Sequence, residues 1–219
     1  MIRTREKIPW WLRLGVGGFF AYAILQNMRA PAEVSSDATA PNLETVMLSE
    51  LRAEVGDARL EEVQARLKQK PELAGLGTRR FSPGELDQLN GLRLHMLQTS
   101  ADLCQSVWSG KDDMPAATRA LRMLSVREQR QWARLMARAV LLEIDDAPAP
   151  ERELVPQEAI EQVASLLSAK QREAFSKAFD PARETTAVEG CIAMRQLMEH
   201  APSLEPVLRE RTLRALAGR

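Results

Sequence analysis

Four helix-start signals in this chain restrict it to an all-α fold. A serine or threonine is followed three residues later by glutamate or glutamine at Ser82–Glu85, Ser125–Glu128, Ser168–Gln171 and Thr186–Glu189. In this capping box, two side chains satisfy N–H groups that the start of a helix leaves unpaired. No stretch of the sequence alternates convincingly between apolar and polar residues, as a half-buried strand would. We therefore predict an irregular all-α helical bundle of six to eight helices.

Apolar spacing places helices between and around these signals. Leucine, valine and methionine recur every three or four residues from Asn42 onward, with an interruption at Gly56. A second apolar face runs from Ser82 to Gly110, which predicts one long helix. The segment 72–80 contains two glycines and is predicted to be a loop.

An apolar stretch near the N-terminus, Ile8–Leu25, is the segment apolar enough to enter a bilayer. Arg3, Arg5 and Lys7 precede it, and basic residues stay on the cytoplasmic side. We therefore expect one N-terminal membrane helix, with the N-terminus cytoplasmic. The predicted organisation is a short cytoplasmic N-terminus at 1–7, a transmembrane signal-anchor at 8–27, a linker at 28–41, and a helical periplasmic domain at 42–219 with a proline-rich hinge at 145–156.

Individual side chains in this stretch fit a single-pass inner-membrane anchor. Three of them suit the membrane interface, namely Trp10, Trp11 and Arg13. Gly17 and Ala21 form a small-xxx-small pair, through which two such helices could make a homodimer. The alternative is a cleaved signal and secretion to the periplasm, because residues 30–32 fit the small-x-small pattern of a cleavage site.

Charge and motif content set limits on function. The 219 residues carry no net charge, but the first 32 have an excess of basic residues. The remainder holds 25 basic and 29 acidic residues, so it lacks the excess of positive charge that is typical of a nucleic-acid-binding domain. The chain has two histidines and no nucleophile elbow, zinc-protease motif or phosphate loop, so we expect no catalytic residues and no enzyme activity. Cys191, Met194 and Met198 could be soft metal ligands, but their spacing is typical of a core, and we predict no metal or cofactor.

The oxidation state of the two cysteines, Cys104 and Cys191, depends on the cellular compartment of the domain. An even number of cysteines in an oxidising compartment favours a disulfide, whereas two reduced thiols would pack as small apolar side chains. If the domain is exported, we predict that these two residues form a disulfide.

Four arginines are spaced along one side of a predicted helix. Arg127, Arg130, Arg134 and Arg138, here called the arginine stripe, fall within an arc of about 80° at 100° per residue. No acid in the same helix is placed to neutralise them, apart from Glu128, which projects elsewhere. The stripe therefore needs acids from another helix, anionic headgroups or an acidic partner, and we consider it a candidate partner-binding surface.

A short segment resembles a known family. Residues 167–172 (LSAKQR) resemble the LTxxQ motif of the Spy/CpxP family of periplasmic helical chaperones, with Ser168 in place of threonine. A looser copy lies at 124–129, where Glu128 stands in the glutamine position. The resemblance implies an exported, cofactor-free helical protein that binds unfolded clients.

The sequence thus predicts a single-pass protein of the inner membrane with most of its chain in the periplasm. We expect it to act as an accessory, scaffold or protein-binding component of an envelope assembly, with another envelope protein as its partner. The alternative functions are a client-binding, chaperone-like protein and, less favoured, an enzyme.

Overall fold

The structure is a computed structural model that describes residues 43–70, 72–111, 113–150 and 154–217. These residues form eleven α-helices and two short 3₁₀ helices, with no strand among them. The all-α prediction is confirmed, but six to eight helices was too few. The helices are α2 Leu43–Val55, α3 Asp57–Gln69, α4 Leu73–Gly77, η2 Thr78–Arg80, α5 Pro83–Thr99, α6 Ala101–Ser109, α7 Met114–Met123, α8 Val126–Ile144, α9 Gln157–Leu166, α10 Ala169–Ala178, α11 Ala187–His200, η3 Ala201–Ser203 and α12 Pro206–Ala217.

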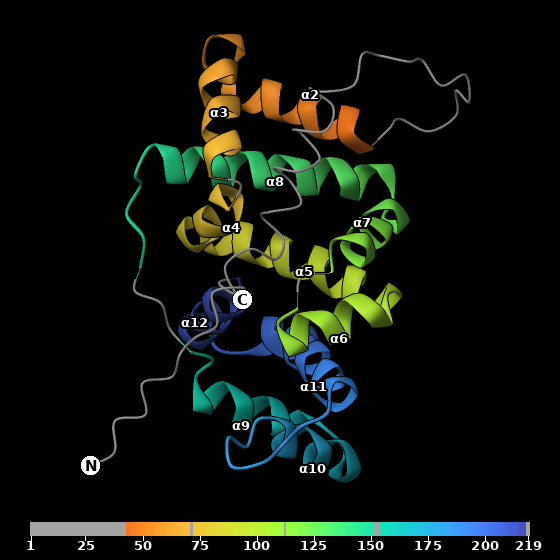
Figure 1. The fold of residues 1–219 in the computed structure, drawn as a ribbon. Coiled ribbons are helices and arrows are strands. Elements are labelled where there is room, and N and C mark those ends of the chain that lie inside the picture. Colours follow the sequence, from red (N-terminus) through yellow and green to blue (C-terminus); the bar gives the residue numbers. More distant parts are fainter. Residues whose placement is uncertain (1–42, 71, 112, 151–153, 218–219) are drawn as a thin grey trace.

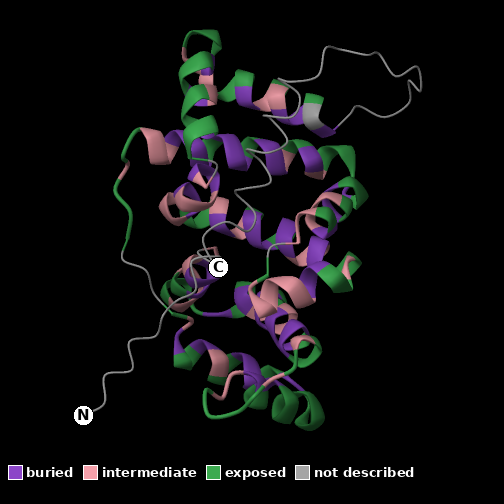
Figure 2. Cartoon of the chain, in the orientation of Figure 1, coloured by how far each residue is buried: buried purple, intermediate pink, exposed green. Residues whose placement is uncertain are grey.

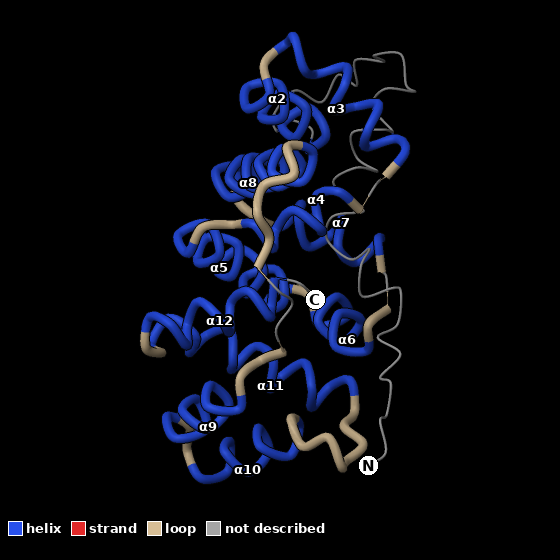
Figure 3. Tube along the Cα trace, turned by 90° about the vertical axis from the view of Figure 1, so that its left-hand side faces the viewer, coloured by secondary structure: helices blue, strands red, loops and turns tan. Residues whose placement is uncertain are grey.

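The helices are stacked in layers along one direction (Figure 1). Helix α2 packs on α8, and α8 packs in turn on α4 and α5. Helices α6, α11 and α12 form the next layer, and α9 and α10 close the far end, where they contact α11 and α12. A view turned by 90° shows the same order (Figure 3). The stack brings the second half of the sequence against the first, because α12 packs on α5 and α11 on α6.

Buried side chains run through the stack as one continuous cluster (Figure 2). Trp132 of α8 and Phe175 of α10 are fully buried in different layers. After α8, residues 145–150 run along the outside of this core (Figure 1), and the described residues of the segment 145–156 contain no helix or strand. Its role as a hinge stays a prediction.

The predicted long helix of residues 82–110 is divided at Ser100. The backbone of Ser100 is extended, at φ −130° and ψ 101°, and its hydroxyl accepts a hydrogen bond from the N–H of Leu103. Serine competes with the helix in this way because its side chain can bind nearby N–H groups and start a new helix. The division lets α6 turn away from α5 toward α11, which lies next to it in the stack.

The predicted loop at 72–80 is instead the short helix α4 followed by η2. Helix α4 lies against α8, and Gly77 lies directly against the backbone of α8. A Cβ atom built on Gly77 would lie 1.8 Å from the carbonyl oxygen of Ala139. The glycine therefore permits backbone-to-backbone contact here, and it does not mark a turn.

Arginine side chains bind the last carbonyl groups of neighbouring helices. Arg172 of α10 donates from Nε to the carbonyl of Ala164 near the end of α9, at 2.9 Å. Arg214 of α12 donates to the carbonyl of Phe81, which follows η2, at 3.0 Å. Helix ends leave four carbonyls without intrahelical partners, and a guanidinium group has enough donors to satisfy more than one. These arginines therefore join α10 to α9 and α12 to the end of η2.

Candidate functional site

The arginine stripe lies on α8, on the side opposite the buried Trp132. Arg134 pairs with Glu50 of α2 at 3.2 Å, and Arg138 pairs with Glu85 of α5 at 3.6 Å. Acids from other helices therefore occupy the C-terminal half of the stripe. The two arginines are exposed, whereas the side chains of Glu50 and Glu85 are 14% and 25% exposed, so the pairs hold the exposed guanidinium groups against acids that lie closer to the core.

The N-terminal half of the stripe is different. Arg127 and Arg130 are exposed, and among the described residues neither has an ion-pair or hydrogen-bond partner. Two large apolar side chains are exposed at the same end of α8, Met123 at 59% and Val126 at 41%. This corner of the α7–α8 turn thus combines free cations with exposed apolar surface.

Glu128 lies within the stripe in sequence but points to a different side of α8. One of its oxygens, Oε2, accepts hydrogen bonds from the hydroxyl of Ser125 at 2.6 Å and from its N–H at 2.9 Å. The other, Oε1, lies 2.7 Å from Nδ1 of His95 on α5. The charge of Glu128 is therefore used to cap α8 and to join it to α5, and it is not directed at Arg127 or Arg130.

The pair of His95 and Glu128 is a site that sequence reasoning missed. A histidine held by a carboxylate is a common part of acid–base catalysis, but it also needs a reacting group within reach. The side chains of both residues are partly exposed, and the nearest hydroxyl bound to Glu128 is the capping hydroxyl of Ser125. The arrangement supports a structural role. The capping box predicted the position of Glu128, but only the packing of α5 on α8 shows its second partner.

Acids at the other end of α8 are also paired. Glu143 binds the nearly buried Arg80 at 2.9 Å, and Asp146 lies 3.4 Å from the same guanidinium group. Asp145 binds Arg59 of α3 at 2.7 Å. Carboxylates at a helix C-terminus face the negative end of the helix dipole, which is unfavourable unless cations compensate. The two arginines supply that compensation and fix α3 and η2 to α8.

These pairs predict a loss of stability in acid. The Ser125 hydroxyl holds the pKa of Glu128 below its ordinary value, with His95 adding to the shift, and Arg59 lowers the pKa of Asp145 by a hydrogen bond and by its charge. A carboxyl group with a lowered pKa in the folded state stabilises the fold fully above its ordinary pKa of about 4 and loses that contribution as the pH falls further. We expect the free energy of unfolding, measured in urea, to decrease between pH 5 and pH 3.

The matched variant for this measurement is Glu128→Gln. Glutamine at this position can still accept the capping hydrogen bonds but does not titrate. The variant should lose less stability than the wild type between pH 5 and pH 3. An identical loss in both proteins would contradict the assignment of Glu128.

The predicted cysteine pair is brought together. The Sγ atoms of Cys104 on α6 and Cys191 on α11 are 2.04 Å apart, at disulfide distance, although 87 residues separate them in sequence. Both residues are buried, at 0% and 6% exposure. Next to them, Gly190 lies so close to Trp108 that a Cβ atom would fall 1.9 Å from the indole ring. Helices α6 and α11 are therefore in tight contact around the pair.

The three residues that the sequence offered as soft metal ligands, Cys191, Met194 and Met198, belong to the core. Met194 and Met198 are buried at 3% and 1% exposure, and the sulfur of Cys191 is bonded to Cys104. Among the described residues, no group of three histidine, cysteine or acidic side chains is arranged to hold a metal ion.

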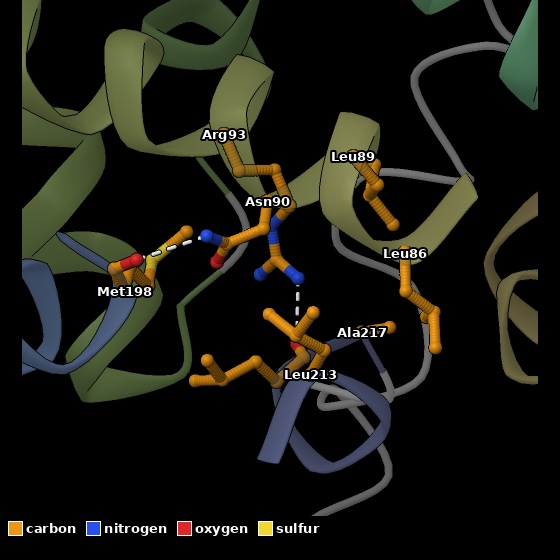
Figure 4. A pocket seen from close by; sticks show the side chains of 8 residues that line it. Leu86, Leu89, Asn90, Arg93, Met198, Leu213 and Ala217 are labelled. Carbon is orange, nitrogen blue, oxygen red and sulfur yellow. Dashed lines mark hydrogen bonds between the residues drawn. The ribbon is translucent and has the colours of Figure 1, made fainter. Parts of the chain in front are cut away.

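A small, mostly apolar cavity with two polar side chains, Asn90 and Arg93, lies between α5, α11 and α12 (Figure 4). Asn90 donates to the carbonyl of Met198 at 2.9 Å, and Arg93 donates to the carbonyl of Leu216 at 2.6 Å. The carbonyl oxygen of the Asn90 side chain is buried and has no hydrogen-bond partner. The cavity measures about 10 Å³, which is about the space that one water molecule needs. It is too small for a substrate, so these residues serve to hold α11 and α12 against α5.

A second hollow, of about 350 Å³, lies between α10 and the start of α11. Three cations and three carboxylates line it, namely Lys170, Lys177, Arg183, Glu173, Glu184 and Glu189. Their charges balance, and Lys177 already pairs with Glu173. The hollow therefore offers no net charge to select an ionic ligand.

The segment that resembles the LTxxQ motif has a structural explanation. The hydroxyl of Ser168 accepts from the N–H of Gln171, and the Oε1 atom of Gln171 accepts from the hydroxyl of Ser168 at 2.6 Å. These contacts form the capping box of α10. The serine and glutamine of the motif are thus accounted for by the start of a helix.

The predicted membrane features lie outside the described residues. This applies to the signal-anchor at 8–27 and the linker at 28–41, and also to the residues Trp10, Trp11, Arg13, Gly17 and Ala21. Within the part of the chain that the structure does describe, no helix has the length and apolarity to cross a membrane.

Comparisons of this chain with known protein families, with curated proteins and with solved structures find no match. The functional argument therefore depends on the residues described above.

Proposed function

We propose that this protein is a membrane-tethered helical component of a cell envelope that acts by binding another envelope protein, as an accessory or scaffold, and does not catalyse a reaction. In this proposal the N-terminus is cytoplasmic, residues 8–27 are the single transmembrane anchor, and the helical domain lies in the periplasm. The observation that carries the proposal is the buried cysteine pair of α6 and α11.

The cysteine pair supports an oxidising compartment. Disulfides persist in the periplasm and in secreted proteins but are rare in the cytosol, where thiols are kept reduced. Cys104 and Cys191 are at bonding distance within the core, so the fold accommodates the bond without exposing either sulfur. A domain built around such a pair needs a route out of the cytosol, and the apolar stretch Ile8–Leu25 is a candidate for that route.

The side chains that could take part in catalysis contact other helices of the fold, which favours a binding role over a catalytic one. His95 and Glu128 join α5 to the start of α8, and the cysteines join α6 to α11. Exposed apolar side chains, by contrast, are distributed over several helices, as with Leu166 at 54%, Ile192 at 49% and Val207 at 74%. Single exposed apolar side chains are common on protein surfaces, so these three positions do not by themselves mark a contact. They sample different helices, and the binding proposal depends on the reactive side chains being used within the fold.

Site-specific cross-linking in the native membrane tests this proposal. A photo-cross-linking residue is placed in the full chain at Leu166, Ile192 or Val207, which lie on α9, α11 and α12. We expect the protein in the membrane fraction, and one discrete adduct of fixed size from at least one position. A ladder of adducts of many sizes would favour the client-binding alternative. A protein found entirely in the soluble fraction would contradict the tether, and no adduct from any position would contradict the binding role.

A further inference from the structure

The exposed corner at the start of α8 has features of a lipid-binding surface. We call Met123, Val126, Arg127 and Arg130 the α8 entry face. At 100° per residue, Val126 and Arg130 are about 40° apart around the helix, and Arg127 is about 60° further round from Arg130. The apolar and cationic side chains are therefore adjacent on one exposed side, as in helices that lie at a membrane interface.

Both cations of this face are available to a ligand. The acids that neutralise the rest of the arginine stripe, Glu50 and Glu85, bind Arg134 and Arg138. The acid nearest in sequence, Glu128, is committed to its cap and to His95. Exposed guanidinium groups without acidic partners favour anionic ligands, and their planar donors match the oxygens of a phosphate group.

The position of the face in the fold indicates which anionic ligand is close. Helix α2 runs in the same direction as α8, so its first residue, Leu43, lies at the end of α8 where the entry face begins (Figure 1). The ion pair of Glu50 with Arg134 fixes this register, because seven residues earlier in each helix lie Leu43 and Arg127. The chain that leads from the predicted anchor therefore enters the domain beside the entry face.

The length of the predicted linker allows the α8 entry face to contact the membrane directly. The predicted linker at 28–41 has fourteen residues, which span at most about 50 Å when fully extended. An anchor in the bilayer therefore keeps the start of α2, and the entry face beside it, within this distance of the membrane surface.

We propose that the α8 entry face docks on anionic lipid headgroups of the membrane that holds the N-terminal anchor. Arg127 and Arg130 bind headgroup phosphates, and Met123 and Val126 enter the interfacial layer. This inference rests on the membrane tether of the proposed function. It goes further by naming the surface that faces the bilayer and the chemistry that it recognises. Each arginine near an anionic surface is expected to strengthen contact by roughly five-fold.

The experiment uses the full chain reconstituted in vesicles, with an environment-sensitive fluorophore on the single substitution Met123→Cys. Vesicles contain phosphatidylglycerol mixed with phosphatidylcholine, or phosphatidylcholine alone. We expect quenching by brominated lipid in the anionic vesicles and about 30-fold less docking after Arg127→Gln with Arg130→Gln. A label at Val126→Cys repeats the measurement at a second position. High salt should weaken the docking, since exposed charges are screened.

Matched control variants distinguish binding by the α8 entry face from a general effect of positive charge on the protein surface. Lys68→Gln with Lys170→Gln removes the same charge from two exposed positions on α3 and α10, and should leave the quenching unchanged. A label at Val207→Cys on α12 should report no difference between the two lipids.

The outcomes also separate this inference from the proposed function. If the full chain fails to insert into vesicles of either kind, the tether itself is wrong. If it inserts but the labels at 123 and 126 remain unquenched in anionic vesicles, the tether stands and lipid docking is wrong. Protection of these labels only when an acidic membrane protein is added would assign the entry face to that protein and would also overturn lipid docking.

Discussion

Replacing Gly77 with alanine is expected to lower the free energy of unfolding by about 3 kcal/mol or more. The new Cβ atom would lie 1.8 Å from the carbonyl oxygen of Ala139 and 2.5 Å from its carbonyl carbon. Both are backbone atoms of α8 and cannot rotate aside. Helices α4 and α8 would have to separate, which would expose the buried Leu73 and Ala74 to water. Urea unfolding followed by far-UV circular dichroism measures the change.

The control for this substitution is Gly91→Ala. Gly91 lies within α5, is exposed, and a Cβ atom there would have nothing within 4 Å. Alanine at this position should raise the free energy of unfolding by about 0.5–1 kcal/mol, because it favours the helix over the unfolded chain. Equal changes at the two glycines would contradict the close approach of α4 to α8.

Removing the cysteine pair with Cys104→Ala and Cys191→Ala is expected to cost a similar or larger amount. On the chain-entropy account, a bond that closes a loop of this length stabilises the fold by about 4 kcal/mol, and the two residues are 87 positions apart. The bond also holds α11 against α6 at the point where Gly190 contacts Trp108. The same unfolding measurement applies, performed with and without reductant.

Reductant provides the control for the cysteine prediction. It should lower the stability of the wild type toward that of the double variant and leave the double variant unchanged. A wild type that unfolds at the same urea concentration with and without reductant would show that the bond does not form, and it would remove the main support for an oxidising compartment.

Local chemistry made much of the fold predictable. The four capping boxes place the starts of α5, α8, α10 and α11 correctly, because they act within one helical turn. The interruption at Gly56 is also present, with a positive φ of 73°. The sequence misled where tertiary contact decided the outcome. Gly77 suggested a loop but serves close packing, and Ser100 divides a helix whose apolar pattern continues across it.

The candidate sites were predictable to different degrees. The partnership of Cys104 and Cys191 could be proposed because only two cysteines are present. The face occupied by the arginine stripe followed from helical spacing, but its partners did not. Glu50 and Glu85 reach α8 from other helices, so the difference between paired and free arginines depends on packing that sequence periodicity does not encode.

The arginine contacts to carbonyl groups have a consequence for local opening. Helix ends ordinarily fray, because their last carbonyls are bound only by water. In this stack, Arg172 holds the end of α9 from α10, and Arg93 holds the end of α12 from α5. Fraying at either end must therefore break a contact with a different helix. Local fluctuations at these ends are coupled to movement between helices, and so to the cooperativity of the whole stack.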